Sequence, residues 1–431
     1  MGRLKKKLSV RSRQLVYHLF YGIAAVLTGL VSVGYAKSFH YAEHVFWKLQ
    51  SAHPHIAFVL TPLCFVVGWW LVKTFAPMAA GSGLPQVAYA AELPEPEKVP
   101  IVHQIFSFKA MVIKIVSSIC CAFGGGAMGR EGPTAQLAGG IFFQMGRLFK
   151  LKIGKTKIDN WVVAGAASGI AAAFNTPLGG IVFAIEELSR NHLKQFRSIL
   201  MISVILGGLT SQVLLGPYLL LGYPVVNPGG WTNVIWAVGI GALLGVLGAV
   251  VTHGLWLVLE LKRKIKWGRY EILVPLCCGL VIAATASVLG NETFGSGFEL
   301  LRRLLFDASY TVTWQDIVAR VISPFVSYLS GASGGVFAPI LAIGGTIAGL
   351  IGQWFNPENV HLMVLMGMIG TLTGLTRAPL TSFVLVFEMT DRHTLIFPLL
   401  VAAISATLVT QWVIKKSFYD LIKEGLEERY T

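Results

Sequence analysis

Two charged residues stand inside one of the most apolar and glycine-rich stretches of the sequence. Arg130 and Glu131 lie within residues 124–140, and Pro133 follows them closely. Glycine lets a backbone turn sharply and approach a ligand, and proline suits the first turn of a helix. We therefore predict a broken helix that restarts near residue 132.

The start of such a helix is suited to binding an anion. Its first backbone N–H groups have no partner within the helix, and its dipole places a partial positive charge there. The carboxylate of Glu131 already stands at this position. Two interpretations follow: Glu131 only caps the helix, or it occupies the place of a mobile anion.

The composition indicates the kind of elements that position these residues. Of the 431 residues, 54% are hydrophobic and 13% are charged, whereas soluble proteins carry about 25% charged residues. We therefore predict an all-α membrane protein with a single transmembrane domain over residues 1–431. Apolar runs near or above the roughly 20 residues that cross a bilayer lie at 15–37, 55–77, 198–216, 231–261, 271–289 and 395–414.

Shorter apolar segments, interrupted by glycine and proline, lie between these runs. Broken helices are tolerated at membrane depth only where protein or a polar cavity surrounds them, so they favour a transport pathway over a receptor bundle. We expect a loop rich in aromatic residues at 39–54, a helical segment at about 105–122 and a basic loop from Arg147 to Lys157.

The net charge of +14 does not indicate nucleic-acid binding, because the basic residues flank the apolar runs. One cluster, at residues 3–13, precedes the first run, and another, at residues 262–269, follows the fourth. Such charges favour the cytoplasmic side of a membrane, so we predict a cytoplasmic N-terminus. The first run has no small-residue cleavage site after a short apolar core, and we interpret it as a retained span.

No chemistry of a cofactor or an enzyme is indicated. The five cysteines lie in apolar segments without the spacing of a metal site. An intramembrane enzyme would need a nucleophile–base pair or a metal set at membrane depth, and the sequence offers neither. We therefore predict no metal, no cofactor and no enzymatic activity.

The second half of the sequence repeats landmarks of the first in the same order. Gly295-Ser-Gly echoes Gly81-Ser-Gly, and the Gly335–Pro339 frame echoes Gly129–Pro133. Glu388 stands nine residues after Pro379, as Glu186 stands nine residues after Pro177. Interrupted segments at corresponding places in two halves are typical of transporters with a site at the repeat interface. We predict inverted repeats at 15–216 and 231–414.

With these motifs assembled, the sequence resembles the CLC family of chloride channels and proton-coupled chloride antiporters over nearly its whole length. Four motifs in the order of the family carry the resemblance, and the fourth is Lys416-Ser-Phe-Tyr419. The residues of the other three are Gly81, Ser82, Gly83, Leu84 and Pro85; Gly129, Arg130, Glu131, Gly132 and Pro133; and Gly335, Val336, Phe337, Ala338 and Pro339.

The resemblance implies a fold of about 17 or 18 helical segments in two inverted halves. It implies a homodimer in the lipid bilayer, with one pathway for chloride and protons in each subunit. Chloride is expected to be held by the hydroxyls of Ser82 and Tyr419 and by the backbone N–H groups of Val336 and Phe337. The C-terminal helix at 415–431 thereby contributes to the anion site, and a bacterial inner membrane is the expected location.

The resemblance also gives roles to two carboxylates. Glu131 matches the external gate, and Glu187 matches the internal proton relay of the exchangers, where channels commonly have an apolar residue. We therefore favour chloride/proton antiport; the alternative is a passive, voltage- or pH-gated chloride channel of the same fold. A structural interpretation of Glu186 and Glu187 as a helix end facing Arg190, Lys194 and Arg197 stays open, and it suits Glu186 better.

Three residues bear on how closely the exchanger pattern is followed. Ser82 favours chloride, because nitrate exchangers of the family place proline there. Gln86 stands where an acidic residue is common in the family, and Ala88 stands where some exchangers carry a glutamate that could pair with an intramembrane lysine, here Lys114. We expect Lys114 to lack that carboxylate partner.

Overall fold

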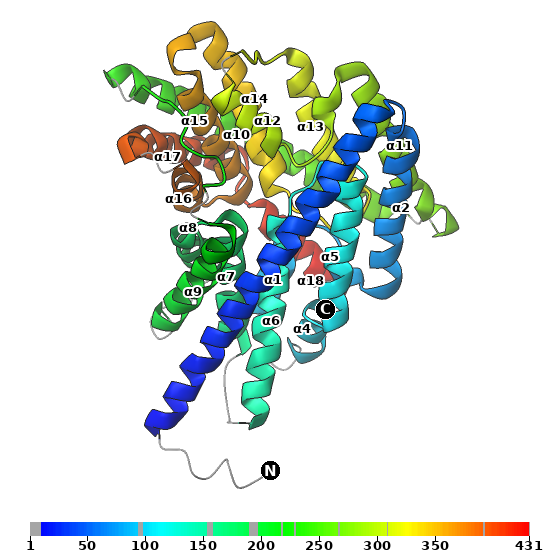
Figure 1. Ribbon diagram of the computed structural model, residues 1–431, viewed down its shortest axis with the longest axis vertical. Coiled ribbons are helices and arrows are strands. Elements are labelled where there is room, and N and C mark those ends of the chain that lie inside the picture. The colour runs from blue at the N-terminus through cyan, green and yellow to red at the C-terminus, as the bar shows by residue number, and fades with distance from the viewer. Residues whose placement is uncertain are drawn as a thin grey trace.

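The chain folds almost entirely into helices, as a computed structural model shows (Figure 1). The structure describes residues 10–93, 98–152, 158–188, 197–216, 219–227, 230–265, 268–307, 309–390 and 393–430. Within these ranges there are 18 α-helices and no β-strand. The predicted fold class and the predicted number of helical segments are confirmed.

The helices of the first half differ greatly in length. The longest is α1, and the shortest, α8, has seven residues and continues into a π-helical turn, η2. Their bounds are α1 Val10–Ala52, α2 Ala57–Phe75, α3 Leu84–Glu92, α4 Lys98–Ile105, α5 Phe108–Phe123, α6 Glu131–Lys152, α7 Ile158–Phe174, α8 Pro177–Phe183, η2 Ala184–Leu188 and α9 Arg197–Leu215.

The second half again mixes long and short helices. Their bounds are α10 Gly230–Lys264, α11 Leu273–Leu289, α12 Phe298–Phe306, α13 Trp314–Leu329, α14 Phe337–Phe355, α15 Val360–Thr376, α16 Pro379–Thr390, α17 Ile396–Val413 and α18 Phe418–Tyr430. Short 3-10 turns connect several of them, among them η1 Pro77–Ala79 before α3 and η5 Asn291–Thr293 before α12.

Eight helical segments among the described residues are long and apolar enough to cross a membrane. Six of them coincide with the predicted apolar runs to within a few residues or contain them. The other two, Phe337–Phe355 and Pro357–Thr376, are 72% and 83% buried within the protein. The chain is therefore a multi-pass integral membrane protein, and its least lipid-exposed spans are the two that the apolar runs did not indicate.

Two expected loops are helical instead. Residues 39–52 belong to α1, where Phe39 and Phe46 are buried against neighbouring helices, so packing compensates for the polar residues between them. Arg147, Lys150 and Lys152 belong to α6 rather than to a basic loop, and residues 153–157 lie outside the described part of the chain. The segment expected at about 105–122 consists mostly of α5, which begins at Phe108.

Close packing of α10, α14, α15 and α17 forms a large part of the core. Small residues make it possible: a Cβ added at Gly248 would lie 2.4 Å from the carbonyl oxygen of Thr371, and one at Gly367 would lie 2.4 Å from that of Gly344. Backbones that approach this closely gain dispersion contacts without needing a hydrophobic driving force, as membrane helices require.

The C-terminal helix α18 lies near the middle of the molecule (Figure 1). Helices α3 and α14 both contact α6. Three glycine-rich connections precede them and are joined by backbone hydrogen bonds. Gly81 pairs with Ser333, and Gly129 pairs with Gly335. Because Gly81 has a φ of 61°, which favours glycine, the sequence itself supports this turn.

Candidate anion site and proton pathway

The three glycine-rich connections place the starts of α3, α6 and α14 around one point. The N–H of Gly129 donates to the carbonyl of Gly335 over 2.8 Å, and the N–H of Gly81 donates to that of Ala332 over 3.0 Å. A Cβ added at Gly335 would lie 3.2 Å from the backbone nitrogen of Gly132. Several helix starts, each with a partial positive charge, therefore face a common centre.

Ser82 is fixed at this centre by its backbone. Its N–H donates to the hydroxyl of Tyr328 over 3.0 Å. Its own Oγ is fully buried and has no hydrogen-bond partner within the described part of the protein. A Cβ added at Gly132 would lie 2.2 Å from that Oγ, so the hydroxyl lies against the first turn of α6.

Tyr419 brings a second hydroxyl from the C-terminal helix. Ser417 and Asp420 cap α18: the N–H of Asp420 donates to Oγ of Ser417 over 3.1 Å, and the N–H of Ser417 donates to the Asp420 carboxylate over 3.2 Å. The ring of Tyr419 stacks on Phe337, with centroids 6.2 Å apart. Its buried Oη has no hydrogen-bond partner among the described residues.

Glu131 is the first residue of α6, so the predicted helix start is confirmed. Its side chain is only 1% exposed, and its Oε2 has no hydrogen-bond partner in the described structure. A Cβ added at Gly129 would lie 2.2 Å from this Oε2 and 3.2 Å from Cβ of Ala338. The carboxylate therefore lies where the start of α6 meets the start of α14.

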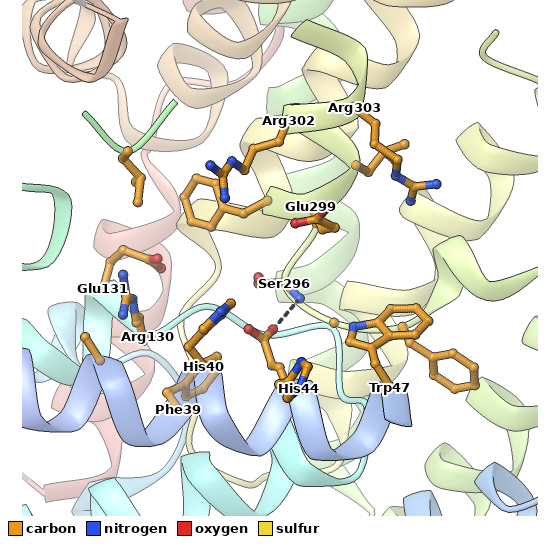
Figure 2. Close-up of a pocket in the computed structure, with 18 of the residues that line it drawn as sticks. Phe39, His40, His44, Trp47, Arg130, Glu131, Ser296, Glu299, Arg302 and Arg303 are labelled. Atoms are coloured by element: carbon orange, nitrogen blue, oxygen red, sulfur yellow. Dashed lines mark hydrogen bonds between the residues drawn. The ribbon is translucent and has the colours of Figure 1, made fainter. Parts of the chain in front are cut away.

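Glu131 also borders a large cavity on the other side. The cavity has a volume of about 720 Å³, and Arg130, Glu131 and α1 residues such as Glu43 line it together with the Gly295–Gly297 connection. Figure 2 shows Arg130 and Glu131 in its wall, with Ser296, Glu299 and Arg302 further along. We call this cavity the vestibule.

Glu187 lies away from the vestibule, in the π-helical turn η2, which packs on α3 and α7. It is half-buried and interacts electrostatically with Tyr419. The structure thus brings Ser82, Val336, Phe337, Tyr419 and Glu131 to one centre and leaves Glu187 at its edge. Of the three basic residues that the structural interpretation invoked, Arg190 and Lys194 lie outside the described residues, as does the side chain of Arg197.

Glu186, by contrast, has a defined structural contact. Its carboxylate accepts hydrogen bonds from the N–H groups of Leu380 and Thr381, at 3.2 and 2.7 Å, at the start of α16. Glu388 does the same for Leu178 and Gly179, at 3.1 and 2.8 Å, at the start of α8. Glu186 thus caps α16, which carries Glu388, and Glu388 caps α8 in return; this contact differs from the basic partners that the structural interpretation of Glu186 expected.

Lys114 has no carboxylate partner within the described residues, as expected, but it is not unpaired. Its Nζ donates to the carbonyls of Ala79, Ala80 and Gly81, at 3.0, 3.4 and 2.8 Å. Gln86 adds a hydrogen bond of 2.8 Å to the carbonyl of Ala80. The lysine and the glutamine together hold the connection that presents Ser82.

Three residues near this centre were missed by the sequence interpretation: Tyr328, Arg320 and Glu43. Tyr328 belongs to no motif, and only its contact with Ser82 reveals it. Arg320 could have been noticed as a charge within an apolar helical pattern. Glu43 was assigned to a loop because the first span was expected to end earlier.

Comparison with known proteins assigns the family. Residues 63–411 match the family described as voltage gated chloride channel. The chain belongs to the CLC family. It is 30% identical over 447 residues to the H(+)/Cl(-) exchange transporter ClcA of Citrobacter koseri, covering 98% of this chain and 91% of the relative. The protein of the same name from Salmonella agona is 30% identical over 424 residues, with 93% and 86% covered.

Solved structures of CLC proteins share the fold. A slow cyanobacterial Cl⁻/H⁺ antiporter superposes with a TM-score of 0.84 at 23% identity, covering 98% of this chain and 99% of the other. A CLC-type fluoride/proton antiporter gives a TM-score of 0.75 at 17% identity, with 96% and 99% covered. The resemblance to the CLC family drawn from the sequence is confirmed.

Proposed function

We propose that this CLC protein is a secondary active transporter that exchanges chloride for protons across the membrane. The observation that carries the proposal is the buried Glu131 carboxylate, whose Oε2 has no partner among the described residues, at a centre that also holds two unpartnered hydroxyls. The curated relatives, named H(+)/Cl(-) exchange transporters, support it. No cofactor is required, since chloride and the proton are the transported species.

Chloride binds at the centre through neutral donors. The O–H groups of Ser82 and Tyr419 donate to it, and so do the backbone N–H groups of Val336 and Phe337 at the start of α14. Hydroxyls and helix starts replace part of the hydration shell of an anion without the full positive charge that would hold it too tightly. Glycine at position 132 leaves the space that this coordination needs.

Glu131 couples the two ions by competing with chloride. When ionised, its carboxylate satisfies the N–H groups at the start of α14 and closes the path from the vestibule. When protonated, it loses the charge that holds it there, and chloride can take its place. Each cycle of this competition moves a proton across the membrane in one direction and chloride in the opposite direction.

Glu187 is the inner proton relay in this proposal. It is half-buried, does not line the vestibule and interacts electrostatically with Tyr419 of the centre. A carboxylate at such a position can take up a proton from the cytoplasm without entering the chloride path. This feature favours antiport over a passive channel.

A flux measurement tests the proposal. Purified protein in liposomes is given an outward chloride gradient, and the external pH is recorded together with chloride efflux. We expect protons to enter against their own gradient while chloride leaves. Chloride efflux without proton movement would establish the channel alternative instead.

Glu131→Ala tests the role of the gate. Removing the carboxylate leaves the anion centre open and removes the group that carries the proton, so chloride efflux should continue while proton uptake falls to background. Glu299→Ala, which removes an exposed carboxylate of the vestibule, is the matched control and should keep coupling. If Glu131→Ala still took up protons in exchange for chloride, Glu131 would be only a helix cap.

Glu187→Gln tests the relay. The amide keeps the shape and hydrogen bonding of the side chain but cannot bind a transported proton. We expect chloride transport to persist and the number of protons moved per chloride to fall at least severalfold. If the number of protons moved per chloride stays unchanged, Glu187 has only a structural role.

The protein is further proposed to be a homodimer in which α8, α9, α16 and α17 form the interface. These helices lie along one side of the molecule (Figure 1). With 7 and 12 residues, α8 and α16 are too short to cross a bilayer, and their capped starts would face lipid there. Backbone ends at membrane depth need protein around them, which a second copy supplies over exposed Leu178 and Leu380.

The membrane orientation is proposed from charge. The basic end of α10 carries Lys262, Arg263 and Lys264, and Lys73 at the end of α2 forms an ion pair with Glu271 nearby. Both ends are therefore assigned to the cytoplasm of a bacterial inner membrane, which places the N-terminus inside and the vestibule outside. The inverted repeats 15–216 and 231–414 agree with this orientation, and the reciprocal capping by Glu186 and Glu388 supports them.

A further inference from the structure

The connection that presents Ser82 has a counterpart in the other half of the protein. Before α3, Gly81 and Gly83 have φ values of 61° and 102°; before α12, Gly295 and Gly297 have φ values of 72° and 92°. The serine between them is buried in both cases. The chain thus builds the same Gly-Ser-Gly turn at the start of two short helices.

Each turn is held by a buried cation from the corresponding neighbouring helix. Lys114 of α5 donates to the carbonyls of residues 79–81. Arg320 of α13 donates to the carbonyls of Gly295, Phe294 and Glu292, the first over 3.0 Å and the second over 2.5 Å. The similarity therefore extends to the support of the turn, and not only to its sequence.

The two turns differ in what their serine meets. The N–H of Ser82 donates to a tyrosine hydroxyl, and the Ser82 hydroxyl has no partner in the described structure. The N–H of Ser296 instead donates over 3.1 Å to the carboxylate of Glu43 from α1, the contact drawn as a dashed line in Figure 2. At the second turn the Glu43 carboxylate therefore occupies the position at which an anion would bind.

A second observation points to a ligand here. Arg320 is 1% exposed, and its Nε–H has no hydrogen-bond partner among the described residues although the residue lines the vestibule. Its Nη1 lies 2.9 Å from the position of a Cβ added at Gly297, so the guanidinium lies directly over the turn. A buried N–H left unpaired costs about 1–3 kcal/mol, which an anion beside it would offset.

The charges around the turn also favour an anion. The vestibule is lined by five cationic side chains and four carboxylates, namely Lys37, Arg130, Arg302, Arg303 and Arg320 against Glu43, Glu131, Glu292 and Glu299, with His40 and His44 in addition. Glu292 is engaged in an ion pair with Arg303. If the Glu43 carboxylate leaves or is replaced, a positive excess faces the Ser296 turn.

We propose that the Gly295–Ser296–Gly297 turn is a second, outer binding site for a small monovalent anion, and that the Glu43 carboxylate occupies it in this structure. The site shares the vestibule with Glu131, so an anion held there is concentrated on the path toward the gate. The choice of chloride-like anions as the ligand rests on the proposed function.

Bromide provides a direct test, because its anomalous scattering identifies it in a crystal. In the unaltered protein soaked in bromide, we expect a peak at the Ser82–Tyr419 centre and none at Ser296. In Glu43→Ala, we expect an additional peak at the N–H of Ser296. Absence of bromide at Ser296 in Glu43→Ala would overturn the proposal.

The central peak separates this proposal from the proposed function. A peak at the Ser82–Tyr419 centre without one at Ser296 contradicts only the outer site, whereas absence of both contradicts the anion transporter itself. Glu299→Ala is the matched control, because it removes the same charge from the same vestibule without vacating the turn. A peak at Ser296 in Glu299→Ala would show that general charge, rather than Glu43, governs the site.

A transport measurement supplies a readout that does not depend on crystals. In liposomes with the vestibule facing outward, Glu43→Ala should lower the external chloride concentration for half-maximal exchange at least threefold, and Glu299→Ala should change it by less. The internal chloride concentration for half-maximal exchange should stay unchanged. An equal change in the two variants would contradict a specific role of Glu43.

Discussion

The centre of the protein buries polar oxygen atoms that nothing in the described chain satisfies. No hydrogen-bond partner among the described residues is found for Oγ of Ser82, Oη of Tyr419 or Oε2 of Glu131. Each unsatisfied buried polar group costs about 1–3 kcal/mol, and a folded protein is stable by only about 5–15 kcal/mol. The two hydroxyls at helix starts are therefore best explained by a ligand that accepts hydrogen bonds, and the Glu131 carboxylate by a group that competes with this ligand for the same place.

Gly132 allows this arrangement, which leads to a prediction. In Gly132→Ala the new Cβ would lie 2.2 Å from Oγ and 2.6 Å from the carbonyl oxygen of Ser82, so the serine must move. We expect chloride affinity, measured by isothermal titration calorimetry, to fall at least tenfold, which corresponds to about 1.4 kcal/mol.

Gly239→Ala is the control for this substitution. Gly239 lies in α10, and a Cβ added there meets nothing within 4 Å. Alanine is the better helix former by about 1 kcal/mol, so affinity should stay unchanged and stability should not fall. Equal loss of affinity in both variants would mean that Gly132 acts through general helix packing and not through Ser82.

At the scale of helices, the two glutamates that cap α8 and α16 tie the halves of the molecule together. Each carboxylate accepts from two backbone N–H groups at the start of a helix from the other half. Carboxylates are favourable there because of the unpaired N–H groups and the helix dipole. The starts of two very short helices are thereby satisfied without water.

Glu186→Ala should therefore destabilise the protein without uncoupling it. Loss of the cap leaves two N–H groups at the start of α16 unpaired, that of Thr381 in a buried residue. We expect unfolding stability to fall by about 1–3 kcal/mol, seen as a lower thermal midpoint in detergent. The ratio of protons to chloride should stay unchanged. In contrast, Glu187→Gln should lower the ratio of protons to chloride and leave the thermal midpoint unchanged. A lower ratio in Glu186→Ala would contradict a purely structural role of Glu186.

The sequence was informative about helices that face lipid and about motifs, and less so about buried helices. α1, α2, α10 and α11 carry long apolar runs because lipid surrounds much of their surface. α14 and α15 have the lower mean hydropathies of 1.4 and 1.3 and are the most buried spans, so close contacts of glycine and threonine replace apolar bulk. Hydropathy reports exposure to lipid, and these two helices have little of it.

The same distinction applies to the candidate site. Ser82, Glu131 and Phe337 lie in motifs with recognisable glycine and proline spacing, and the resemblance to the family indicated Tyr419 through the Lys416–Tyr419 motif. Tyr328, Arg320 and Glu43 act through contacts between segments far apart in the chain. Such contacts depend on how the helices pack, and no local spacing predicts them.

At the scale of the whole molecule, one chain supplies every residue of the proposed pathway. The vestibule, the centre and Glu187 are all built from residues of this one chain, in the regions of α1, α3, α6, η2, α12, α13, α14 and α18 among others. The proposed interface of α8, α9, α16 and α17 lies on one side of the molecule (Figure 1). A second copy would therefore cover short helices without contributing a ligand.

The proposed homodimer would contain two independent pathways, and a mixed dimer tests them. In a tandem protein with one unaltered subunit and one Glu131→Ala subunit, the unaltered pathway should still exchange protons for chloride while the other conducts chloride alone. Proton uptake per dimer should be about half that of the unaltered tandem, and chloride should continue to leave when the proton gradient opposes exchange. Loss of all proton uptake would contradict independent pathways. A single intact Glu131 with a complete set of ligands around it would then be insufficient for proton exchange, and the two gates would have to act together.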